Sequence, residues 1–337
     1  MSDIRLDTIN NKYVIIAPER LHRPNLQSYS REKSSKVNCP FCEGNEHMTP
    51  NEVYALRYNE PNKGMWKTRV VPNLYKAVQV ELEDKSQRDG VFEFKSGVGA
   101  HEILIDSPCH DCDINDLSVF DVENWLRTMI LRIEDLKDDK RLIHLSIFKN
   151  FGQNAGATQD HPHTQLLALP IMPKKQLAFL NRNIEYYFRH GRGKIEDIVH
   201  NEIKAKKRVL YIVGNFVSFC PYASEYPFEV MIAPTKNISS LNRCSREDLI
   251  DLANIIKMTF KKLNKQLGVF DYNLFFDLAP LNSNFETEKY MASIDKNYRF
   301  TIKITPRIYR SGGFEISTGM FINSVEPEYC ARLLRGD

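Results

Sequence analysis

The order of expected strands and helices repeats once along the chain, and this repetition constrains the fold more than any other feature. In each half a strand is followed by a helix and then by two further strands, because residues with strand-like or helix-like apolar spacing recur in that order. The ranges are 102–108, 119–137, 142–149 and 163–169 in the first half, and 228–234, 249–267, 272–278 and 300–306 in the second. The pattern predicts an α+β fold built by duplication of one unit.

A charged, helix-prone segment lies between the two halves. Residues 174–207 are therefore predicted to connect an N-terminal repeat, 1–173, to a C-terminal repeat, 208–337. The histidines are divided unequally. The last one is His200, in the connector, so the C-terminal repeat has none. The first repeat is expected to carry the chemistry, and the second to be architectural or to hold substrate.

Composition and charge exclude several classes of protein. The chain has 337 residues, of which 42% are hydrophobic and 26% charged, with a formal net charge of +3. This profile is typical of a soluble protein, and no apolar run reaches the roughly 18–20 residues of a membrane span. The N-terminus lacks the apolar core of an export signal, so we expect a cytoplasmic protein. Basic residues are mixed with acidic ones, which disfavours nucleic acid as a partner but allows a local site for a phosphorylated small molecule.

Seven cysteines, an odd number, favour free thiols and metal ligands over disulfide bridges in a chain without an export signal. Cys39 and Cys42 have the spacing of a zinc knuckle, although a redox-active or idle pair has the same spacing. A zinc site would need two further ligands. The candidates are His47, His101, His110, His144, His161 and His163.

Three polar residues alternate at the start of the strand expected at 163–169. His161, His163 and Gln165 would share one face, because successive strand residues point to opposite sides. An exposed edge strand, or a metal site that uses both histidines, would explain this pattern. A sharper interpretation has one imidazole on a metal and the next one free to attack a substrate.

A loop of small residues precedes these histidines. Within 150–158, the side chains of Gly152, Ala155, Gly156 and Ala157 are small enough for the backbone to approach an anion closely, as in phosphate-binding loops. Neutral imidazole is a good nucleophile near pH 7 and forms a labile bond to phosphorus. The loop and the histidines together predict transfer of a phosphorus-containing group.

Four segments follow one another along the chain: Cys39-Pro-Phe-Cys42, Ser107-Pro-Cys-His110, the stretch 150–165 with its His-Pro-His-Thr-Gln, and Pro221-Tyr-Ala-Ser-Glu-Tyr-Pro-Phe-Glu229. In this order they resemble the galactose-1-phosphate uridylyltransferase family of the histidine-triad superfamily. The segment 312–319 is similar to a relative that works as an ADP-glucose phosphorylase.

The resemblance implies two histidine-triad-like repeats, each an antiparallel sheet with packed helices, and a homodimer. It also implies one structural zinc ion per chain. The implied zinc ligands are Cys39, Cys42, His110 and His161. The implied catalytic residues are the nucleophile His163 and Gln165, which would bind the transferred phosphoryl group. The implied nucleotide and substrate contacts are Arg23, Asn73, Asn150, Gly156, Ala157, Thr158 and Gly319, with Gln165.

Such an enzyme works by a ping-pong mechanism, in which a sugar 1-phosphate leaves before an acceptor phosphate takes the nucleotide. The first hypothesis is a UDP-glucose–hexose-1-phosphate uridylyltransferase. The alternatives are an ADP-glucose phosphorylase that transfers AMP to phosphate, a nucleotide hydrolase or sensor, and an inactive zinc scaffold. Thr164 stands where the uridylyltransferases usually have glycine, and Lys303 lies where relatives place a second metal, which is not expected here. His101 is expected to be a satisfied structural histidine.

Overall fold

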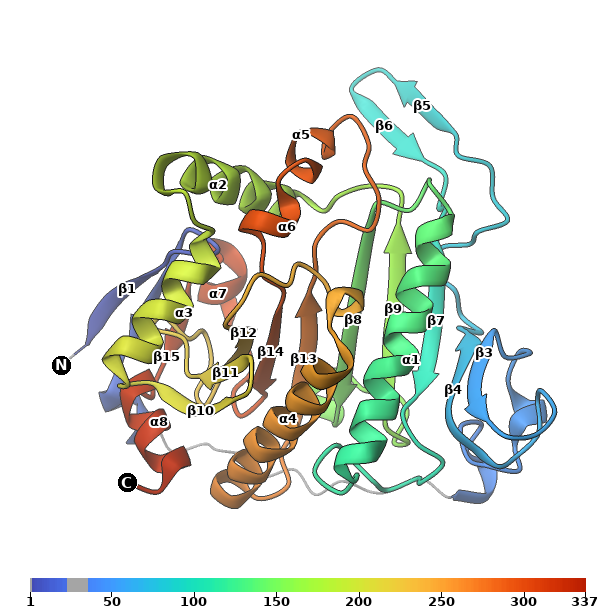
Figure 1. Ribbon diagram of the computed structural model, residues 1–337, viewed down its shortest axis with the longest axis horizontal. Coiled ribbons are helices and arrows are strands. Elements are labelled where there is room, and N and C mark those ends of the chain that lie inside the picture. Colours follow the sequence, from blue (N-terminus) through green and yellow to red (C-terminus); the bar gives the residue numbers. More distant parts are fainter. Residues whose placement is uncertain (1, 23–35) are drawn as a thin grey trace.

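The computed structural model describes residues 2–22 and 36–337, and its centre is one ten-stranded sheet (Figure 1). All neighbouring strands in this sheet are antiparallel. The first half contributes β3 (Tyr54–Arg57), β4 (Trp66–Pro72), β7 (Ala100–Ile105), β8 (His144–Phe151) and β9 (His163–Leu169). The second half contributes β10 (Val209–Val213), β11 (Phe216–Phe219), β12 (Val230–Pro234), β13 (Tyr272–Asp277) and β14 (Thr301–Pro306).

The strand order confirms the predicted duplication. From one edge to the other it reads β10-β11-β12-β14-β13-β8-β9-β7-β4-β3, so the second half has the order of the first, reversed. The halves meet where β13 pairs with β8, with Phe275 opposite Phe148. The α+β fold with antiparallel strands is thus confirmed, and the two repeats form a single continuous sheet.

Two long helices, α1 (Val119–Asp138) and α4 (Arg246–Leu267), lie side by side across one face of this sheet (Figure 1). Each begins with the same capping box, formed by Ser118 with Asp121 and by Ser245 with Asp248. In such a box a side chain binds a backbone N–H that the helix itself leaves unpaired. The shared cap is a local sign of the duplication.

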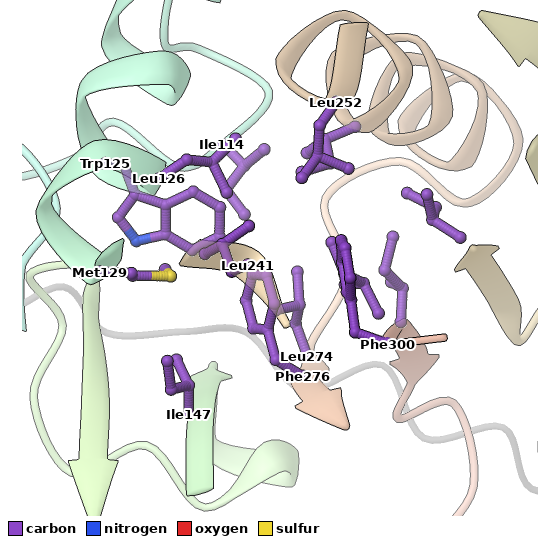
Figure 2. Close-up of a cluster of buried hydrophobic side chains, with 14 of the residues drawn as sticks. Ile114, Trp125, Leu126, Met129, Ile147, Leu241, Leu252, Leu274, Phe276 and Phe300 are labelled. Carbon is purple, nitrogen blue, oxygen red and sulfur yellow. The ribbon is translucent and has the colours of Figure 1, made fainter. Parts of the chain in front are cut away.

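The largest hydrophobic core lies between these helices and the sheet (Figure 2). Trp125 and Met129 project from α1, Leu252 projects from α4, and Phe276 and Phe300 come from the sheet side. All five are at most 4% exposed, and burial of each such side chain contributes about 1.5–3 kcal/mol. This layer covers one face of β9, so a site on β9 must use the other face.

The predicted connector contains two helices, α2 (Lys174–His190) and α3 (Lys194–Ala205). The domain boundaries drawn from the sequence stay a prediction. The other helices are α5 (Glu288–Met291), α6 (Ile294–Asn297), α7 (Gly313–Thr318) and α8 (Pro327–Arg335), with 3-10 turns at Pro18–His22, Lys36–Asn38, Glu46–Met48, Gln153–Ala155 and Leu241–Arg243. A separate hairpin, β5 (Ser86–Asp89) with β6 (Phe92–Lys95), projects from the body (Figure 1).

The N-terminal strands lie with the second repeat. β1 (Asp3–Asp7) pairs with β2 (Lys12–Ile16), and β2 pairs in parallel with β15 (Phe321–Asn323) near the C-terminus (Figure 1). The two ends of the chain are therefore held together by a three-stranded sheet. Among the described residues, no helix has the length and apolar character needed to cross a membrane.

Candidate functional site

The four predicted metal ligands come together from three separate segments. Cys39 and Cys42 share a tight turn, in which the Cys42 N–H donates to the Cys39 carbonyl at 3.2 Å. His110 lies in the loop after β7, and His161 lies in the bend before β9. Their ligand atoms all lie within 4.8 Å of one another.

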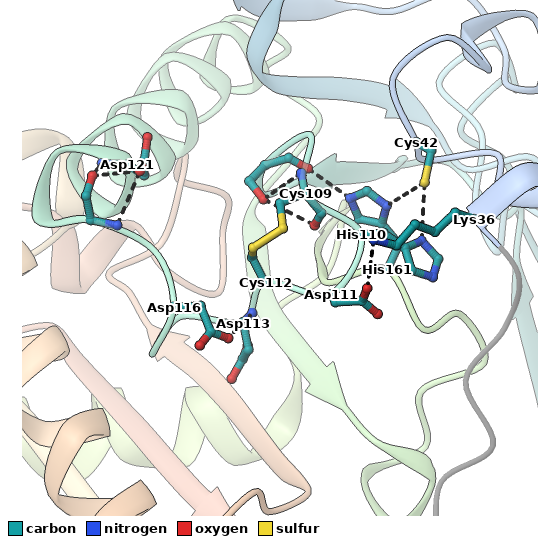
Figure 3. The surroundings of a disulfide bond; sticks show 12 residues. Lys36, Cys42, Cys109, His110, Asp111, Cys112, Asp113, Asp116, Asp121 and His161 are labelled. Atoms are coloured by element: carbon teal, nitrogen blue, oxygen red, sulfur yellow. Dashed lines mark hydrogen bonds and ion pairs between the residues drawn. A yellow bond between two sulfur atoms is a disulfide. The ribbon is translucent and has the colours of Figure 1, made fainter.

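The rings are turned so that coordination is possible. The Nδ1 atom of His161 lies 3.8 Å from Cys39 Sγ and 3.6 Å from Cys42 Sγ, and His110 Nδ1 lies 3.2 Å from Cys42 Sγ (Figure 3). A tetrahedral zinc ion with Zn–S and Zn–N distances of ordinary length places its ligand atoms about 3.3–3.8 Å apart. The observed distances between the ligand atoms fit such an ion.

The protonation states also fit a cation. His161 donates from Nε2 to the carbonyl oxygen of Ser107 at 2.8 Å, which leaves the lone pair of Nδ1 directed toward the cysteines. Burial lowers the pKa of His161 to about 4, so its ring is neutral. Burial and the neighbouring Cys39 raise the pKa of Cys42 to about 11. The Cys42 thiol thus needs a nearby cation to become a thiolate near neutral pH, and the set of two cysteines and two histidines is one that zinc prefers.

A disulfide bond between Cys109 and Cys112 brackets His110 (Figure 3). The expectation of free thiols and metal ligands was wrong for this pair. The three-residue separation was visible in the sequence, and it brings the two Cα atoms to 5.4 Å, a distance that a disulfide spans without backbone movement. Cys112 therefore restrains the loop that carries the candidate ligand His110.

His163 is the first residue of β9 and is 5% exposed. Its Nδ1 atom donates to the carbonyl oxygen of His161 at 3.0 Å, so Nε2 keeps a free lone pair. Burial lowers the pKa of His163, which keeps the ring neutral. The edge of Phe41 packs against the ring at a centroid distance of 5.3 Å and limits its rotation. The structure thus presents a fixed, unprotonated nitrogen.

His163 lines a cavity of about 270 Å³. The predicted site residues Asn73, Thr158 and Gln165 line it too. Apolar residues, among them Phe41 and Tyr75, form another part of its wall. A cavity with a few polar groups and flat apolar walls is typical of sites for ligands such as nucleotides.

The predicted phosphate loop is held tightly in shape. Gly152 and Gly156 adopt the positive backbone angles, φ 85° and 82°, that glycine accepts at least cost. The N–H groups of Gly156 and Ala157 donate to the carbonyl oxygens of Gln153 and Gly152. These two donors therefore shape the loop, and their contact with a phosphate stays a prediction.

Residues of the second repeat support this loop. Asn273 on β13 donates to Asn150 Oδ1 at 2.8 Å and to the Ala155 carbonyl oxygen at 2.9 Å. Asp271 accepts from the Asn154 N–H at 2.8 Å, and a Cβ atom at Gly152 would overlap its carboxylate. No sequence pattern pointed to either residue, since each acts on a segment about 120 positions away through the pairing of β8 with β13.

The opposite face of β9 carries a buried polar network. Thr164 Oγ1 accepts from Trp125 Nε1 at 2.9 Å and donates to Asp106 Oδ1 at 2.8 Å. The other oxygen of Asp106 accepts from Lys149 Nζ at 2.6 Å. The network joins β9 to α1, β7 and β8. Thr164, noted as a departure from the family pattern, therefore has a structural function.

Two predicted substrate contacts remain, Arg23 and Gly319. Arg23 is outside the described residues. Gly319 caps the C-terminal end of α7, beside β15, and is not among the residues that line the cavity of His163. Both assignments stay predictions.

The fold and the site together define a class: a two-repeat α+β protein with a buried, cavity-lining histidine beside a Cys2His2 cluster. Residues 1–173 match the family described as galactose-1-phosphate uridyl transferase, N-terminal domain, and residues 180–316 match its C-terminal domain. The chain belongs to the galactose-1-phosphate uridylyltransferase family of nucleotidyltransferases, as the sequence motifs indicated.

Similar proteins span nearly the whole chain. An ADP-glucose phosphorylase from Arabidopsis thaliana is 30% identical over 99% of this chain and 92% of its own length. A galactose-1-phosphate uridylyltransferase from Kluyveromyces lactis is 26% identical over 84% of this chain and 79% of its own length. The crystal structure of an Arabidopsis ADP-glucose phosphorylase with bound ADP-glucose has a TM-score of 0.84, at 30% identity, and covers 100% of this chain and 99% of that one. A uridylyltransferase structure, 23% identical with a TM-score of 0.75, covers 100% of this chain and 98% of that one, and supports the fold alone.

Proposed function

We propose that this enzyme transfers a nucleoside monophosphate from a nucleoside diphosphate sugar to an acceptor phosphate through a covalent bond to His163. The observation that carries the proposal is the orientation of His163. Its Nδ1 atom donates a hydrogen bond to the His161 carbonyl oxygen. The free lone pair is therefore on Nε2, and His163 lines the cavity, so Nε2 is the proposed nucleophile.

In the first step, Nε2 of His163 attacks the α-phosphorus of the donor. A nitrogen–phosphorus bond forms as the bond from the α-phosphorus to the bridging oxygen breaks, and the sugar 1-phosphate leaves with the electron pair. In the second step, an oxygen of the acceptor phosphate attacks the same phosphorus and the imidazole leaves neutral. No proton has to move on Nδ1, because its hydrogen bond to His161 is present throughout. Gln165, on the same face of β9, is proposed to bind the phosphoryl oxygens, with Asn150 and Thr158 beside it.

A zinc ion is proposed for the cluster of Cys39, Cys42, His110 and His161. The fit of its donor atoms supports this assignment. Bound zinc would stabilise the segment before β9 and hold the His161 carbonyl oxygen in place. It would therefore act on the aim of His163 rather than on the substrate.

Two donors remain candidates. Membership of the uridylyltransferase family supports UDP-glucose with a hexose 1-phosphate acceptor. A specific observation favours ADP-glucose with phosphate: the ADP-glucose phosphorylase is more similar, in identity and in structure, than the uridylyltransferases named above.

Cytoplasmic location and homodimer formation stay predictions, and light scattering would measure the latter.

Intact-protein mass spectrometry decides between the donors. The protein is incubated separately with UDP-glucose and with ADP-glucose, and then with galactose 1-phosphate or inorganic phosphate. The donor that leaves a monophosphate adduct is the substrate, and the acceptor that removes the adduct completes the reaction. If neither donor leaves an adduct on the zinc-loaded protein, the proposed function is wrong.

A further inference from the structure

The side chain of Gln165 contacts a histidine that the proposed mechanism does not use. His101 lies on β7, one strand over from Gln165, and its Nε2 atom is 3.0 Å from Gln165 Oε1. Asn73, which lines the cavity, approaches the same nitrogen at 3.1 Å. His101 thus lies behind two polar residues of the cavity wall.

The hydrogen bonds of His101 assign its protonation. The backbone N–H of Ala77 points at His101 Nδ1 from 3.2 Å, and this nitrogen must therefore supply a lone pair. A neutral ring with a lone pair on Nδ1 carries its hydrogen on Nε2. Two amide atoms lie within hydrogen-bond distance of Nε2. The one from Asn73 is Nδ2, which has no lone pair to accept with, because Asn73 Oδ1 is turned to the Tyr75 N–H. Nε2 therefore donates to Gln165 Oε1, the carbonyl oxygen of the other amide.

This donation settles the orientation of an amide that could otherwise flip. A glutamine side chain has an acceptor oxygen at one corner and two donor hydrogens at the other. With Oε1 held by His101, the NH2 group of Gln165 is the part left to face the cavity. A phosphoryl group presents only acceptor oxygens, so the amide has to present donors to it.

We propose that His101 is a positioning residue, which holds the Gln165 amide in the one orientation that donates to the transferred phosphoryl group. The inference rests on the proposed function, since it gives Gln165 a phosphoryl ligand. It changes the sequence-based expectation for His101 from a satisfied structural histidine to a residue that acts through Gln165.

The second repeat provides an internal comparison. On the first repeat Gln165 pairs with Ile103, and His101 is two residues before Ile103. On the second repeat Lys303 pairs with Met231, and Glu229 is two residues before Met231.

The pair of residues in the second repeat, Lys303 and Glu229, forms a buried ion pair, with Lys303 Nζ 3.2 Å from Glu229 Oε1. Each repeat therefore has a polar side-chain pair at the same register between two equivalent strands, β7 and β9 in the first repeat and β12 and β14 in the second. Only the first repeat has an amide there, and it is the repeat that contains the nucleophile. An ion pair would have served if holding the strands together were the only requirement.

The kinetics of two His101 variants test the proposal. His101→Phe removes the donor and keeps a ring of similar size, whereas His101→Gln restores an N–H donor at similar reach. We expect His101→Phe to lower the rate of adduct formation at saturating donor by about 10- to 100-fold, the usual effect of losing an outer hydrogen-bond partner. The KM for the donor and the zinc content should change little, and His101→Gln should recover most of the rate.

In the Gln165→Ala background, His101→Phe should have no additional effect, because the two residues act as one unit. Additive losses in the double variant, or equal losses for His101→Phe and His101→Gln, would overturn the proposal.

A measurement without substrate separates this proposal from the proposed function. Nitrogen-15 spectra of the histidine side chains should show His101 protonated on Nε2, with a resonance that shifts in Gln165→Ala and does not shift in the matched variant Gln159→Ala. A hydrogen on Nδ1, or a resonance indifferent to Gln165, would contradict the positioning function even if nucleotidyl transfer is confirmed. A protein that forms no adduct but keeps this hydrogen bond would instead contradict the proposed function.

Discussion

The Nδ1 atom of His163 lies 3.0 Å from the carbonyl oxygen of His161. This contact joins the candidate nucleophile to the backbone of a candidate metal ligand. Because His161 is also held by the Ser107 carbonyl oxygen and faces both cysteines, its carbonyl has little freedom to move. The cluster therefore fixes both the tautomer and the direction of the His163 ring.

The pH dependence of adduct formation tests the neutral state of His163. Burial lowers the pKa of this imidazole, and the protonated ring has no lone pair for attack. As the pH falls, the rate should be lost only below the ordinary histidine pKa of about 6.5. Single-turnover rates measured between about pH 5 and 8 should therefore fall to half of their maximum at a pH below about 6.5. Half-loss of the rate at or above that pH would contradict the assignment.

Removal of one candidate ligand tests the metal site. Cys42→Ser should weaken zinc binding by more than about 100-fold, the upper figure for loss of an outer-shell partner, and should lower the melting temperature. Metal analysis and thermal unfolding provide the measurements. Cys244→Ser is the matched control, because Cys244 is free and is not part of the cluster. If Cys42→Ser binds as much zinc as the unmodified protein, Cys42 is not a zinc ligand.

The network beneath β9 predicts a stability effect for Thr164→Val. This near-isosteric change leaves Trp125 Nε1 without its acceptor and one oxygen of Asp106 without its donor. The expected loss is about 1–3 kcal/mol in the free energy of unfolding, as measured by urea denaturation. Thr259→Val should cost much less, since the buried Thr259 hydroxyl has no hydrogen-bond partner among the described residues. Equal effects of the two changes would disprove the importance of the network.

Loss of the Asn273 side chain tests the contribution of the second repeat. Asn273→Ala removes two hydrogen bonds that hold Asn150 and the loop at Ala155. Adduct formation should slow by about 10- to 100-fold while zinc content stays unchanged. Asn254→Ala, at a half-buried position on α4 in the helix layer of the other face, is the control. A normal rate for Asn273→Ala would show that the loop holds its shape without the second repeat.

Local patterns were sufficient to predict much of the fold, whereas the four residues of the Cys2His2 cluster needed more than local patterns. The strand β9 has the predicted bounds, 163–169, and α1 extends the predicted helix by one residue, to Asp138. These elements follow from apolar spacing and capping signals that lie within a few residues of one another. The ligand set came from a family resemblance, and spacing alone had left six histidines open as candidates.

Contacts between distant segments could not be predicted in this way. The pairing of β8 with β13, which brings Asn273 to the loop at Asn150, depends on how the two repeats dock. The bond from His101 to Gln165 depends on the register of β7 with β9, which the sequence pattern does not specify. The disulfide between Cys109 and Cys112 joins two residues that are close in the sequence, so it was open to prediction. The general expectation of free thiols in a chain without an export signal led to the wrong prediction.

Localisation of the nucleotide tests the central claim most directly. The protein is incubated with the donor that gives an adduct, cleaved under mildly basic conditions that preserve phosphorus–nitrogen bonds, and sequenced by mass spectrometry. The nucleoside monophosphate should be found on His163, and His163→Ala should form no adduct while its zinc content stays unchanged. A nucleotide on another residue, or an adduct that persists in His163→Ala, would contradict the account.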